Sequence, residues 1–270
     1  MKELLTRITV ALFGIPLLVF LILQGGWYFF ALILIISVAG QIEFYNIAKN
    51  KNFSAQYIPG IIATILILAT VQAGYNEFLL SGLIISSLFI FTFEMFRKNS
   101  SAIVDIAVTF LGIIYPGLFL AAMLFLRNNI EKLHISSAAG FILTLFVSIW
   151  ACDTFAYFVG KPLGKHRLFE KVSPKKSIEG ALGGLAGALF VFLCVHYLRW
   201  YDISLEMSIC SGIIVGVFGQ VGDLIESWFK RDSAIKDSSK ILPGHGGFLD
   251  RFDSLIYVSP VFYIVYLLTV

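Results

Sequence analysis

The sequence predicts an all-α integral membrane protein, built as a polytopic bundle of about nine transmembrane helices. Its composition supports this: 58% of the 270 residues are hydrophobic and only 14% are charged, whereas a water-soluble domain has about 25% charged residues. The mean hydropathy of +0.87 agrees with this composition. In addition, long apolar runs recur along the whole chain, and about 20 apolar residues suffice to cross a hydrocarbon core of about 30 Å.

The apolar segments follow one another with short polar connections. The first could pass for the core of a signal peptide, but no small-x-small cleavage site follows it, so we expect a retained helix with a kink at Pro16. Cys152, Cys194 and Cys210 lie inside apolar segments without CxxC spacing, which favours packing over a disulfide framework or a zinc site. The predicted spans are 8–25, 27–46, 57–74, 77–96, 102–126, 137–160, 180–199, 205–226 and 254–270.

The basic residues predict the orientation. Of the 20 Lys and Arg residues, all but Arg127, Lys132 and Arg199 fall on the side of the N-terminus. Because positively charged loops stay in the cytoplasm, we expect a cytoplasmic N-terminus, an outer C-terminus and a multi-pass location in the cell inner (plasma) membrane. The spans then divide into two regions, with the long basic loops 161–179 and 227–253 in the second; the regions are 1–136, with about five spans, and 137–270, with about four.

Several acidic residues lie within or at the ends of the predicted spans, where an ionisable side chain indicates function by default. In the predicted topology each is near the cytoplasmic end of its helix, so together they favour a polar basin open to the cytoplasm over a path across the membrane. For Glu43 and Glu94 alone the preferred interpretation is an interfacial carboxylate at a helix end. The full set is Glu43, Glu94, Asp105, Asp153, Asp223 and Glu226.

The end of the span 205–226 carries a polar stripe. Helical spacing places Gln220, Asp223, Ser227 and Lys230 on one face, with Glu226 beside them. A polar stripe on an apolar, glycine-rich helix predicts a lined cavity, and hydrogen bonding between helices is the alternative.

A second polar face lies at the end of the span 137–160, where Asp153, Tyr157 and Lys161 repeat every four residues. The glycines that follow, in "GALGGLAGA", resemble a nucleotide-binding loop only superficially, because no βαβ unit surrounds them. The spacings Gly180/Gly184 and Gly183/Gly187 are instead typical of close helix packing.

The stretch "KRDSAIKDSSKILPGHGGFLDRFD" combines cations, carboxylates and glycines between two apolar segments. Phosphoryl and nucleotidyl transfer need such groups, because positioning and charge neutralisation carry most of the catalysis. Asp223, Asp250 and Asp253 offer the carboxylates that Mg²⁺ prefers, and the glycines allow backbone N–H groups to approach a phosphate. Capping of the last helix is the alternative role for Asp250 and Asp253.

These residues carry a family resemblance. The stretch 227–253 resembles the C-terminal signature of the phosphatidate cytidylyltransferases, also called CDP-diacylglycerol synthases, and "GQVGDLIES" and "SPKKSIEG" resemble further parts of that family. The detailed resemblance covers 153–180 and 219–253, whereas 1–150 is similar only in hydropathy and number of spans. The matching signature positions are Ser227, Lys230, Arg231, Lys236, Asp237, Pro243, His245, Gly246, Gly247, Asp250, Arg251 and Asp253.

The resemblance implies a metal-dependent membrane nucleotidyltransferase that converts CTP and phosphatidate to CDP-diacylglycerol and pyrophosphate for phospholipid biosynthesis, with 137–270 as its catalytic region. It implies an active site open to the cytoplasm and to the lipid headgroups. The expected partners are CTP, phosphatidate and membrane lipids, with no nucleic acid, and a homodimer is an alternative to a monomer. The expected cofactor is Mg²⁺, with a second metal ion as an option.

The resemblance also implies roles for single residues. His245 either hydrogen-bonds the triphosphate or protonates the leaving pyrophosphate, and Lys176, Ser177 and Lys161 hold either the lipid phosphate or the nucleotide. The expected metal ligands are Asp223 and Asp250, followed by Asp253 and Glu226. Asp223 and Asp250 are also expected to be catalytic, with the phosphate-neutralising Lys230, Arg231 and Arg251, and with Lys236 among the substrate-binding residues. The further substrate-binding candidates are Asp153, Glu179, Ser227, Asp237, Gly246 and Gly247.

Two other functions use similar features. Another CTP-dependent membrane enzyme, such as a polyprenol kinase or a synthase acting on an ether-lipid phosphate, needs the same groups and differs in its product. An anion transporter or channel also has many spans and membrane-embedded acids. The one-sided charge and the cluster "HGGFLDRFD" argue against transport.

Overall fold

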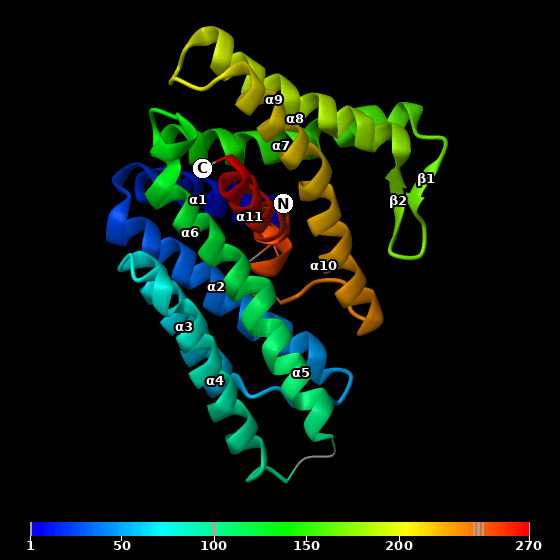
Figure 1. Cartoon of the computed structure of the whole chain (residues 1–270). Helices are drawn as coiled ribbons and strands as arrows, with labels where there is room; N and C mark the ends of the chain where they lie inside the picture. Colours follow the sequence, from blue (N-terminus) through cyan, green and yellow to red (C-terminus); the bar gives the residue numbers. More distant parts are fainter. Residues whose placement is uncertain (1, 99–100, 240, 242–243, 245, 270) are drawn as a thin grey trace. The chain divides into compact units, whose positions relative to one another are not determined.

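The computed structural model describes residues 2–98, 101–239, 241, 244 and 246–269. Helices form most of the described chain (Figure 1). They are α1 (Lys2–Gln24), α2 (Gly26–Lys49), α3 (Tyr57–Gln72), α4 (Leu79–Glu94), α5 (Ala102–Gly112), α6 (Phe119–Asn129), α7 (Ala138–Leu163), α8 (Ile178–Leu198), α9 (Leu205–Ile214), α10 (Gln220–Asp232) and α11 (Leu249–Thr269). The wider π-helical turns Ile113–Leu118 and Val215–Gly219 join α5 to α6 and α9 to α10, and the 3₁₀ turns Asn76–Phe78 and Ile130–Leu133 precede α4 and follow α6.

The helices confirm the predicted class, a polytopic helical membrane protein. Among the described residues, 7 helical segments are long and apolar enough to span a membrane, and Leu12–Gln24 and Tyr57–Gln72 are shorter apolar helices. Each predicted span therefore coincides with an apolar helix. The number of spans and the sides on which the termini lie stay predictions.

Three helix ends differ from the predicted spans for identifiable reasons. α8 begins at Ile178 because Ser177 caps it, accepting a hydrogen bond from the Gly180 N–H at 3.1 Å. α10 continues past 226 as an amphipathic helix to Asp232, with Lys230 and Arg231 in its last turn, where cations are favoured. α11 begins at Leu249 rather than 254 because a carboxylate, Glu43, accepts hydrogen bonds from the Phe248 and Leu249 N–H groups.

The connection between α7 and α8 contains a small sheet that the prediction of an all-α chain did not include. Strands β1 (Arg167–Phe169) and β2 (Ser173–Ser177) form an antiparallel hairpin, with Arg167 opposite Ser177. Glu179, on the first turn of α8, accepts hydrogen bonds from the backbone N–H groups of Lys165 and His166 and contacts the His166 ring at 2.7 Å. These contacts fix the base of the hairpin.

The chain packs into two compact units. Unit 1 contains Met1–Phe125 and Phe229–Phe252, and unit 2 contains Leu126–Trp228 and Asp253–Val270. Both α10 and α11 contribute residues to both units. This division follows packing, and the predicted functional division into 1–136 and 137–270 stays a prediction.

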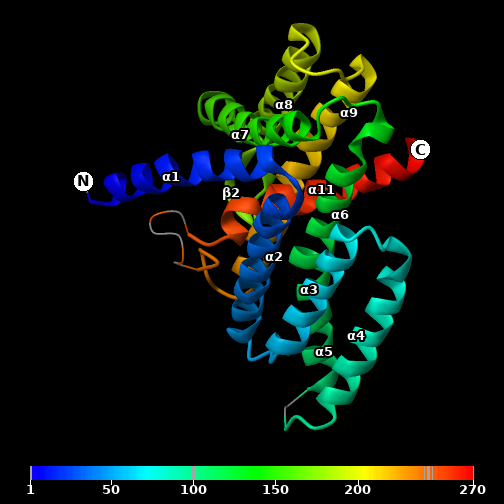
Figure 2. The same cartoon turned by 90° about the vertical axis from the view of Figure 1, so that its left-hand side faces the viewer.

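The core of unit 1 is organised around α2, which runs beside α3, while α3 runs beside α4 (Figure 2). Tyr45 on α2 is fully buried, and its phenol donates a hydrogen bond to the Thr109 carbonyl of α5 at 2.9 Å. A Cβ at Gly60 or Gly112 would collide with Tyr45. Glycine at these two positions therefore lets α3 and α5 approach α2.

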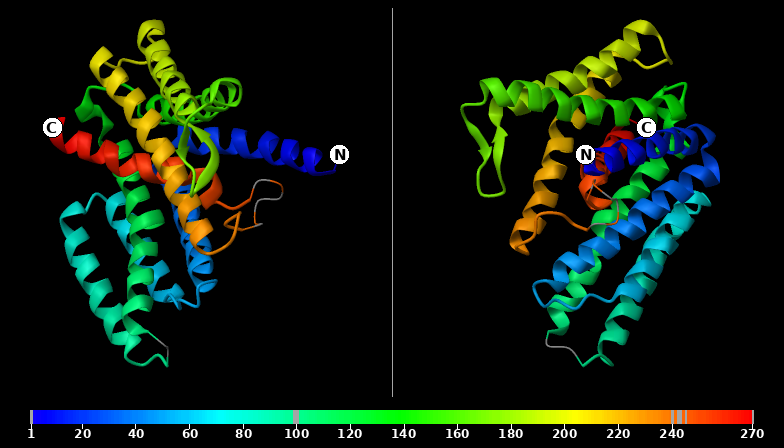
Figure 3. Two further views of the ribbon diagram at one scale, coloured as in Figure 1. Left: turned by 90° about the vertical axis from the view of Figure 1, so that its right-hand side faces the viewer. Right: turned by 180° about the vertical axis from the view of Figure 1, so that it is seen from behind.

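In unit 2, α7 and α8 lie side by side (Figures 1 and 3). The contact confirms the predicted glycine packing: a Cβ on Gly180 would lie 2.9 Å from the Ala156 carbonyl, and one on Gly184 would lie 3.0 Å from the Cys152 carbonyl. Cys152 is buried in this interface as a free thiol, in agreement with a packing role.

Candidate active site

A pocket of about 520 Å³ lies in unit 2, enclosed by α7, the hairpin, α8 and α10. It confirms that Asp153, Tyr157 and Lys161 share one face of α7, because all three line it. The cations and carboxylates give the pocket the polarity expected for an anionic ligand bound with a counter-ion. The lining residues are Asp153, Ala156, Tyr157, Gly160, Lys161, Leu168, Lys175, Lys176, Ser177, Gly180, Ala181, Gln220 and Asp223.

The central polar contact of the pocket joins the hairpin to α10. The ammonium of Lys176 lies 2.5 Å from Oδ2 of Asp223, and the two side chains are 29% and 32% exposed. The hydroxyl of Ser227, one turn along α10, donates to Oδ1 of Asp223 at 3.3 Å. A pair that is a third exposed can exchange its partner for a ligand without a large desolvation cost.

The start of α10 is shaped by the π-helical turn that precedes it. The Gln220 side-chain amide donates to the carbonyl of Gly216 within this turn and, at 3.0 Å, to the carbonyl of Ala181 on α8. Gln220 therefore supplies hydrogen bonds to carbonyls beside a widened helical turn, a feature often found at functional sites. These bonds tie α10 to α8 one turn before Asp223.

Several candidates in the hairpin region have structural partners of their own. The Lys161 ammonium lies 3.2 Å from the Tyr157 hydroxyl and 5.4 Å from the centre of its ring. Ser177 caps α8 and Glu179 closes the hairpin, so both position the pocket wall, and Ser177 also lines the pocket. The structure brings Asp153, Lys161, Lys176, Ser177 and Asp223 together.

Carboxylates of unit 2 gather near this pocket. Asp253 follows the first turn of α11, and Asp153 and Asp223 line the pocket. Gly222 lets the backbones of α10 and α11 approach closely, because a Cβ there would lie 2.6 Å from the Asp253 carbonyl. Carboxylate oxygens are the ligands that Mg²⁺ prefers, so Asp223 and Asp253 are donors of a type that would fit a divalent cation.

The described residues contain no group of three or more His, Cys, Asp or Glu side chains already arranged to hold a metal ion. Glu226, the remaining predicted ligand in unit 2, is 1% exposed within α10. The predicted metal ligands therefore stay a prediction.

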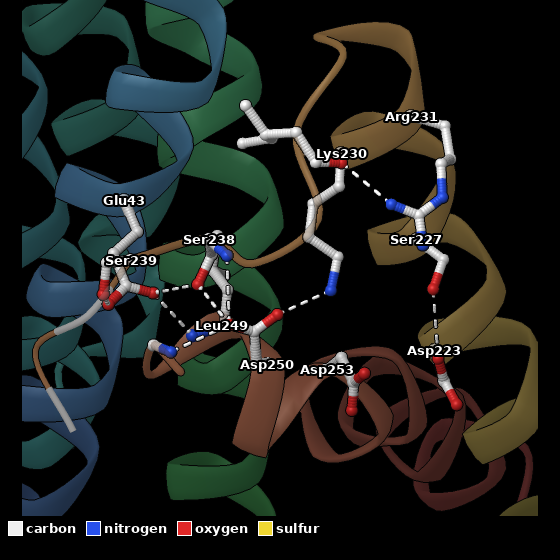
Figure 4. A network of polar contacts seen from close by, with 12 residues as sticks. Glu43, Asp223, Ser227, Lys230, Arg231, Ser238, Ser239, Leu249, Asp250 and Asp253 are labelled. Carbon is white, nitrogen blue, oxygen red and sulfur yellow. Dashed lines mark hydrogen bonds and ion pairs between the residues drawn. The ribbon is translucent and has the colours of Figure 1, made fainter. Parts of the chain in front are cut away.

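A second polar network lies in unit 1, at the start of α11 (Figure 4). Oδ1 of Asp250 is 2.5 Å from the Lys230 ammonium, and these side chains are 8% and 10% exposed. Oδ2 of Asp250 accepts hydrogen bonds from the N–H groups of Ser238, at 3.0 Å, and Gly247, at 2.8 Å, and from the Ser238 hydroxyl at 2.9 Å. Both oxygens of Asp250 thus have protein donors, but these donors lie before α11, so the alternative role of Asp250 as a cap of this helix stays a prediction.

Glu43 organises the same network, and the preferred interpretation of it as an interfacial carboxylate was wrong. Its side chain is 0% exposed on α2. Oε1 accepts from the Ser239 hydroxyl at 2.6 Å and the Phe248 N–H at 2.9 Å, and Oε2 accepts from the Ser238 hydroxyl and the Leu249 N–H, both at 2.8 Å (Figure 4). The signal in the sequence was the presence of an ionisable residue inside an apolar helix.

Glu94 is also buried rather than interfacial. It is 4% exposed, and its Oε2 lies 2.7 Å from Nη1 of Arg97 and 2.5 Å from Nε2 of Gln56. Asp105, in contact with the Ser54 N–H at 2.7 Å, is 2% exposed as well. Unit 1 therefore buries several carboxylates, each with a hydrogen-bond donor.

The other signature residues lie around this network or outside it. The Arg231 guanidinium donates to the Ile235 carbonyl at 2.9 Å, which fixes the end of α10. Lys236, Asp237 and Arg251 are exposed. Gly246 has a φ of 81°, and a Cβ there would lie 2.6 Å from Oδ2 of Asp250. His245 lies outside the described residues.

Comparison with known proteins shows the family of the chain. A family model described as "Cytidylyltransferase family" matches residues 5–269. The chain is 35% identical over 251 residues to a phosphatidate cytidylyltransferase of Staphylococcus haemolyticus, with 92% of this chain and 94% of the relative covered. It is 37% identical over 254 residues to the enzyme of that name from Staphylococcus saprophyticus, with the same coverage. The chain belongs to the cytidylyltransferase family.

Proposed function

We propose that the protein transfers the cytidylyl group of CTP to phosphatidate, giving CDP-diacylglycerol and pyrophosphate. The observation that carries this proposal is the pocket of unit 2, where Lys176 and Asp223 meet among Lys161, Lys175 and Asp153. The two relatives are named for this activity, and the match covers 94% of each of them. Cations and carboxylates in one partly exposed pocket suit a reaction between two phosphate-bearing substrates.

The chemistry is an in-line displacement at phosphorus. An oxygen of the phosphatidate phosphate attacks the α-phosphorus of CTP, a new O–P bond forms, and the bond to the β-phosphate oxygen breaks to release pyrophosphate. A phosphate monoester is already a nucleophile near neutral pH, so no covalent enzyme intermediate is needed. The chain therefore contributes positioning and charge neutralisation.

Cations in the pocket of unit 2 and cations of unit 1 are both suited to neutralising phosphate charge. Lys161, Lys175 and Lys176 line the pocket and neutralise phosphate oxygens there. The Lys176 ammonium can exchange its contact with Asp223 for a contact with a substrate phosphate. Arg251, Lys236 and Arg231 remain candidates for binding the triphosphate.

We assign Mg²⁺ to the carboxylates. Asp223 and Asp253 are the proposed ligands in unit 2, with Glu226 next. In unit 1, Asp250 is a proposed ligand only if Lys230 leaves its Oδ1, because Oδ2 already accepts three hydrogen bonds. Held by these carboxylates, such an ion would supply positive charge that neutralises substrate phosphate.

We also place the protein in the inner (plasma) membrane, with the pocket facing the cytoplasm and the lipid headgroups. The one-sided distribution of Lys and Arg supports this orientation. CTP reaches the pocket from water, whereas phosphatidate reaches it from the membrane.

The test follows two labels of CTP. Detergent-purified protein is incubated with phosphatidate, Mg²⁺ and CTP carrying a label on the α- or the γ-phosphate. We expect the α-label in a chloroform-soluble CDP-lipid and the γ-label in pyrophosphate, both dependent on metal and phosphatidate. A γ-label in lipid indicates a kinase instead, and label in neither product from folded protein contradicts a CTP-dependent lipid enzyme.

A further inference from the structure

We propose that Glu43 is a positioning residue for the transfer reaction. From α2 it fixes Ser238 and Ser239 together with the first residues of α11, and so holds Asp250 and Gly247 in place. The inference rests on the proposed function, because it links Glu43 to signature residues assigned to that reaction. Glu43 itself lies outside the segments of detailed resemblance to the family.

The first argument concerns the start of α11. The first N–H groups of a helix lack partners within the helix, and a nearby polar side chain usually caps them. Here the position before the helix is Phe248, which has no polar side-chain atom. Glu43 accepts from the N–H groups of Phe248 and Leu249 at 2.9 and 2.8 Å, and so caps α11 from a different helix. A carboxylate is favoured at this end of a helix because of the helix dipole.

The second argument links Glu43 to Asp250 through Ser238. The Ser238 hydroxyl oxygen lies 2.8 Å from Oε2 of Glu43 and 2.9 Å from Oδ2 of Asp250. The Ser238 N–H also donates to Asp250, at 3.0 Å. If loss of the Glu43 carboxylate displaces Ser238, the hydrogen bonds to Asp250 change. The position of Lys230, which pairs with Asp250, then changes as well.

The third argument comes from a glycine of the signature. A Cβ at Gly247 would collide with the Ser238 hydroxyl oxygen and with both carboxylate oxygens of Glu43. Glu43 and Ser238 thus leave no room at position 247 for a residue larger than glycine. The Gly247 N–H meanwhile donates to Asp250 at 2.8 Å, so the same close packing serves both carboxylates.

The experiment compares Glu43→Gln with Glu94→Gln. The Gln side chain keeps the shape of Glu43 but turns an N–H group toward donors. Glu94 is the matched control, because it is also a buried glutamate of unit 1, and its hydrogen bonds reach Gln56 and Arg97 instead. Turnover, the KM for CTP and the midpoint of thermal unfolding are measured for both variants and for the parent.

We expect Glu43→Gln to lower the turnover of folded protein about 100-fold, the size expected for small misplacements of a reacting group, and to raise the KM for CTP. A purely stabilising role would lower the unfolding midpoint without changing either constant. Turnover and KM of Glu43→Gln within threefold of the parent, or changes equal to those of Glu94→Gln, would overturn the proposal.

Two further measurements keep the proposal testable if Glu43→Gln fails to fold. Ser239→Ala removes one donor to Glu43 and should lower turnover about fivefold, the value of one ordinary hydrogen bond. Hydrogen exchange at the Phe248 and Leu249 amides should accelerate in the Glu43 and Ser239 variants but not in Glu94→Gln. Unchanged turnover and exchange in Ser239→Ala would contradict the proposal.

The exchange rates also separate this inference from the proposed function. They report whether Glu43 holds the start of α11, whatever reaction the protein catalyses. If the parent makes no CDP-lipid, the proposed function and the assignment of Glu43 to that reaction both fail. If the parent is active and the exchange rates do not respond to Glu43, only the inference fails.

Discussion

Two lysine–aspartate pairs in this molecule have the same geometry and different surroundings. Lys176 and Asp223 in unit 2, and Lys230 and Asp250 in unit 1, both approach to 2.5 Å. The first pair lines a pocket and is 29% and 32% exposed, whereas the second is 10% and 8% exposed and enclosed by further donors. Breaking a buried ion pair costs much more free energy than breaking a partly exposed one. The surroundings of a pair, rather than the distance between its nitrogen and oxygen atoms, therefore decide whether a ligand can replace one partner.

The largest effect is expected at the carboxylate of the exposed pair. Asp223→Asn keeps the size of the side chain and removes its charge, which we expect to lower turnover about 100- to 1,000-fold, as for other electrostatic groups at a reacting centre. Incorporation of α-labelled CTP into lipid measures the effect. Because Asp223 is a third exposed, the unfolding midpoint should barely change. Normal turnover in this variant rules out the assignment of Asp223.

The buried pair should respond strongly in stability as well as in turnover. Lys230→Met leaves the Asp250 carboxylate buried without its ammonium partner, and we expect a loss of about 3–5 kcal/mol in the free energy of unfolding. Denaturant titration in detergent measures it. Adding Asp250→Asn to Lys230→Met should restore part of the loss, because the uncompensated charge is gone. An unchanged unfolding curve for the single variant would mean that the two pairs do not differ as proposed.

The lysine of the exposed pair gives the counterpart experiment. Lys176→Met should change the free energy of unfolding by less than about 1 kcal/mol, as for other exposed pairs. Its effect should instead be a higher KM for the substrate whose phosphate Lys176 binds, measured for CTP and phosphatidate separately. Unchanged KM values for both substrates exclude a substrate-binding role.

The smallest effect is expected at an ion pair on the surface of unit 1. Lys51 lies 2.7 Å from Asp232, and the two side chains are 35% and 56% exposed. Lys51→Ala should leave turnover within a factor of two and the unfolding midpoint nearly unchanged, because such pairs contribute little. This variant serves as the baseline for the other three, and a marked loss of turnover here would show that distance, and not exposure, governs the response.

The sequence predicted the helices well and their ends less well. Apolar runs of sufficient length identify membrane helices directly, since backbone groups in lipid must bond within the helix. The start of α11 depends on Glu43, which precedes Leu249 by 206 residues, and a local pattern contains no information on such a contact. The hairpin between α7 and α8 was missed for a related reason, as Glu179 closes it from the next helix.

Several residues that line the candidate site were singled out from the sequence, but their pairings were not. The four-residue repeat of Asp153, Tyr157 and Lys161 indicated one face of α7, and the pocket confirms it. The contact between Lys176 and Asp223 joins positions 47 residues apart, so no periodicity reveals it. Glu43 was misjudged because its distance from a helix end does not distinguish contact with the headgroups from burial against serines much later in the chain.

The long separation between Glu43 and its donors also bears on how the protein is made. Ser238 and Leu249 follow Glu43 by 195 and 206 residues. At about 5–20 residues per second, a ribosome completes α2 some 10 to 40 s before it reaches them. During that interval the nascent α2 carries a carboxylate without its final donors, which disfavours deep insertion of this turn into lipid. The start of α11 then acquires its cap only after the last helix has emerged, which makes this contact a late step in assembly.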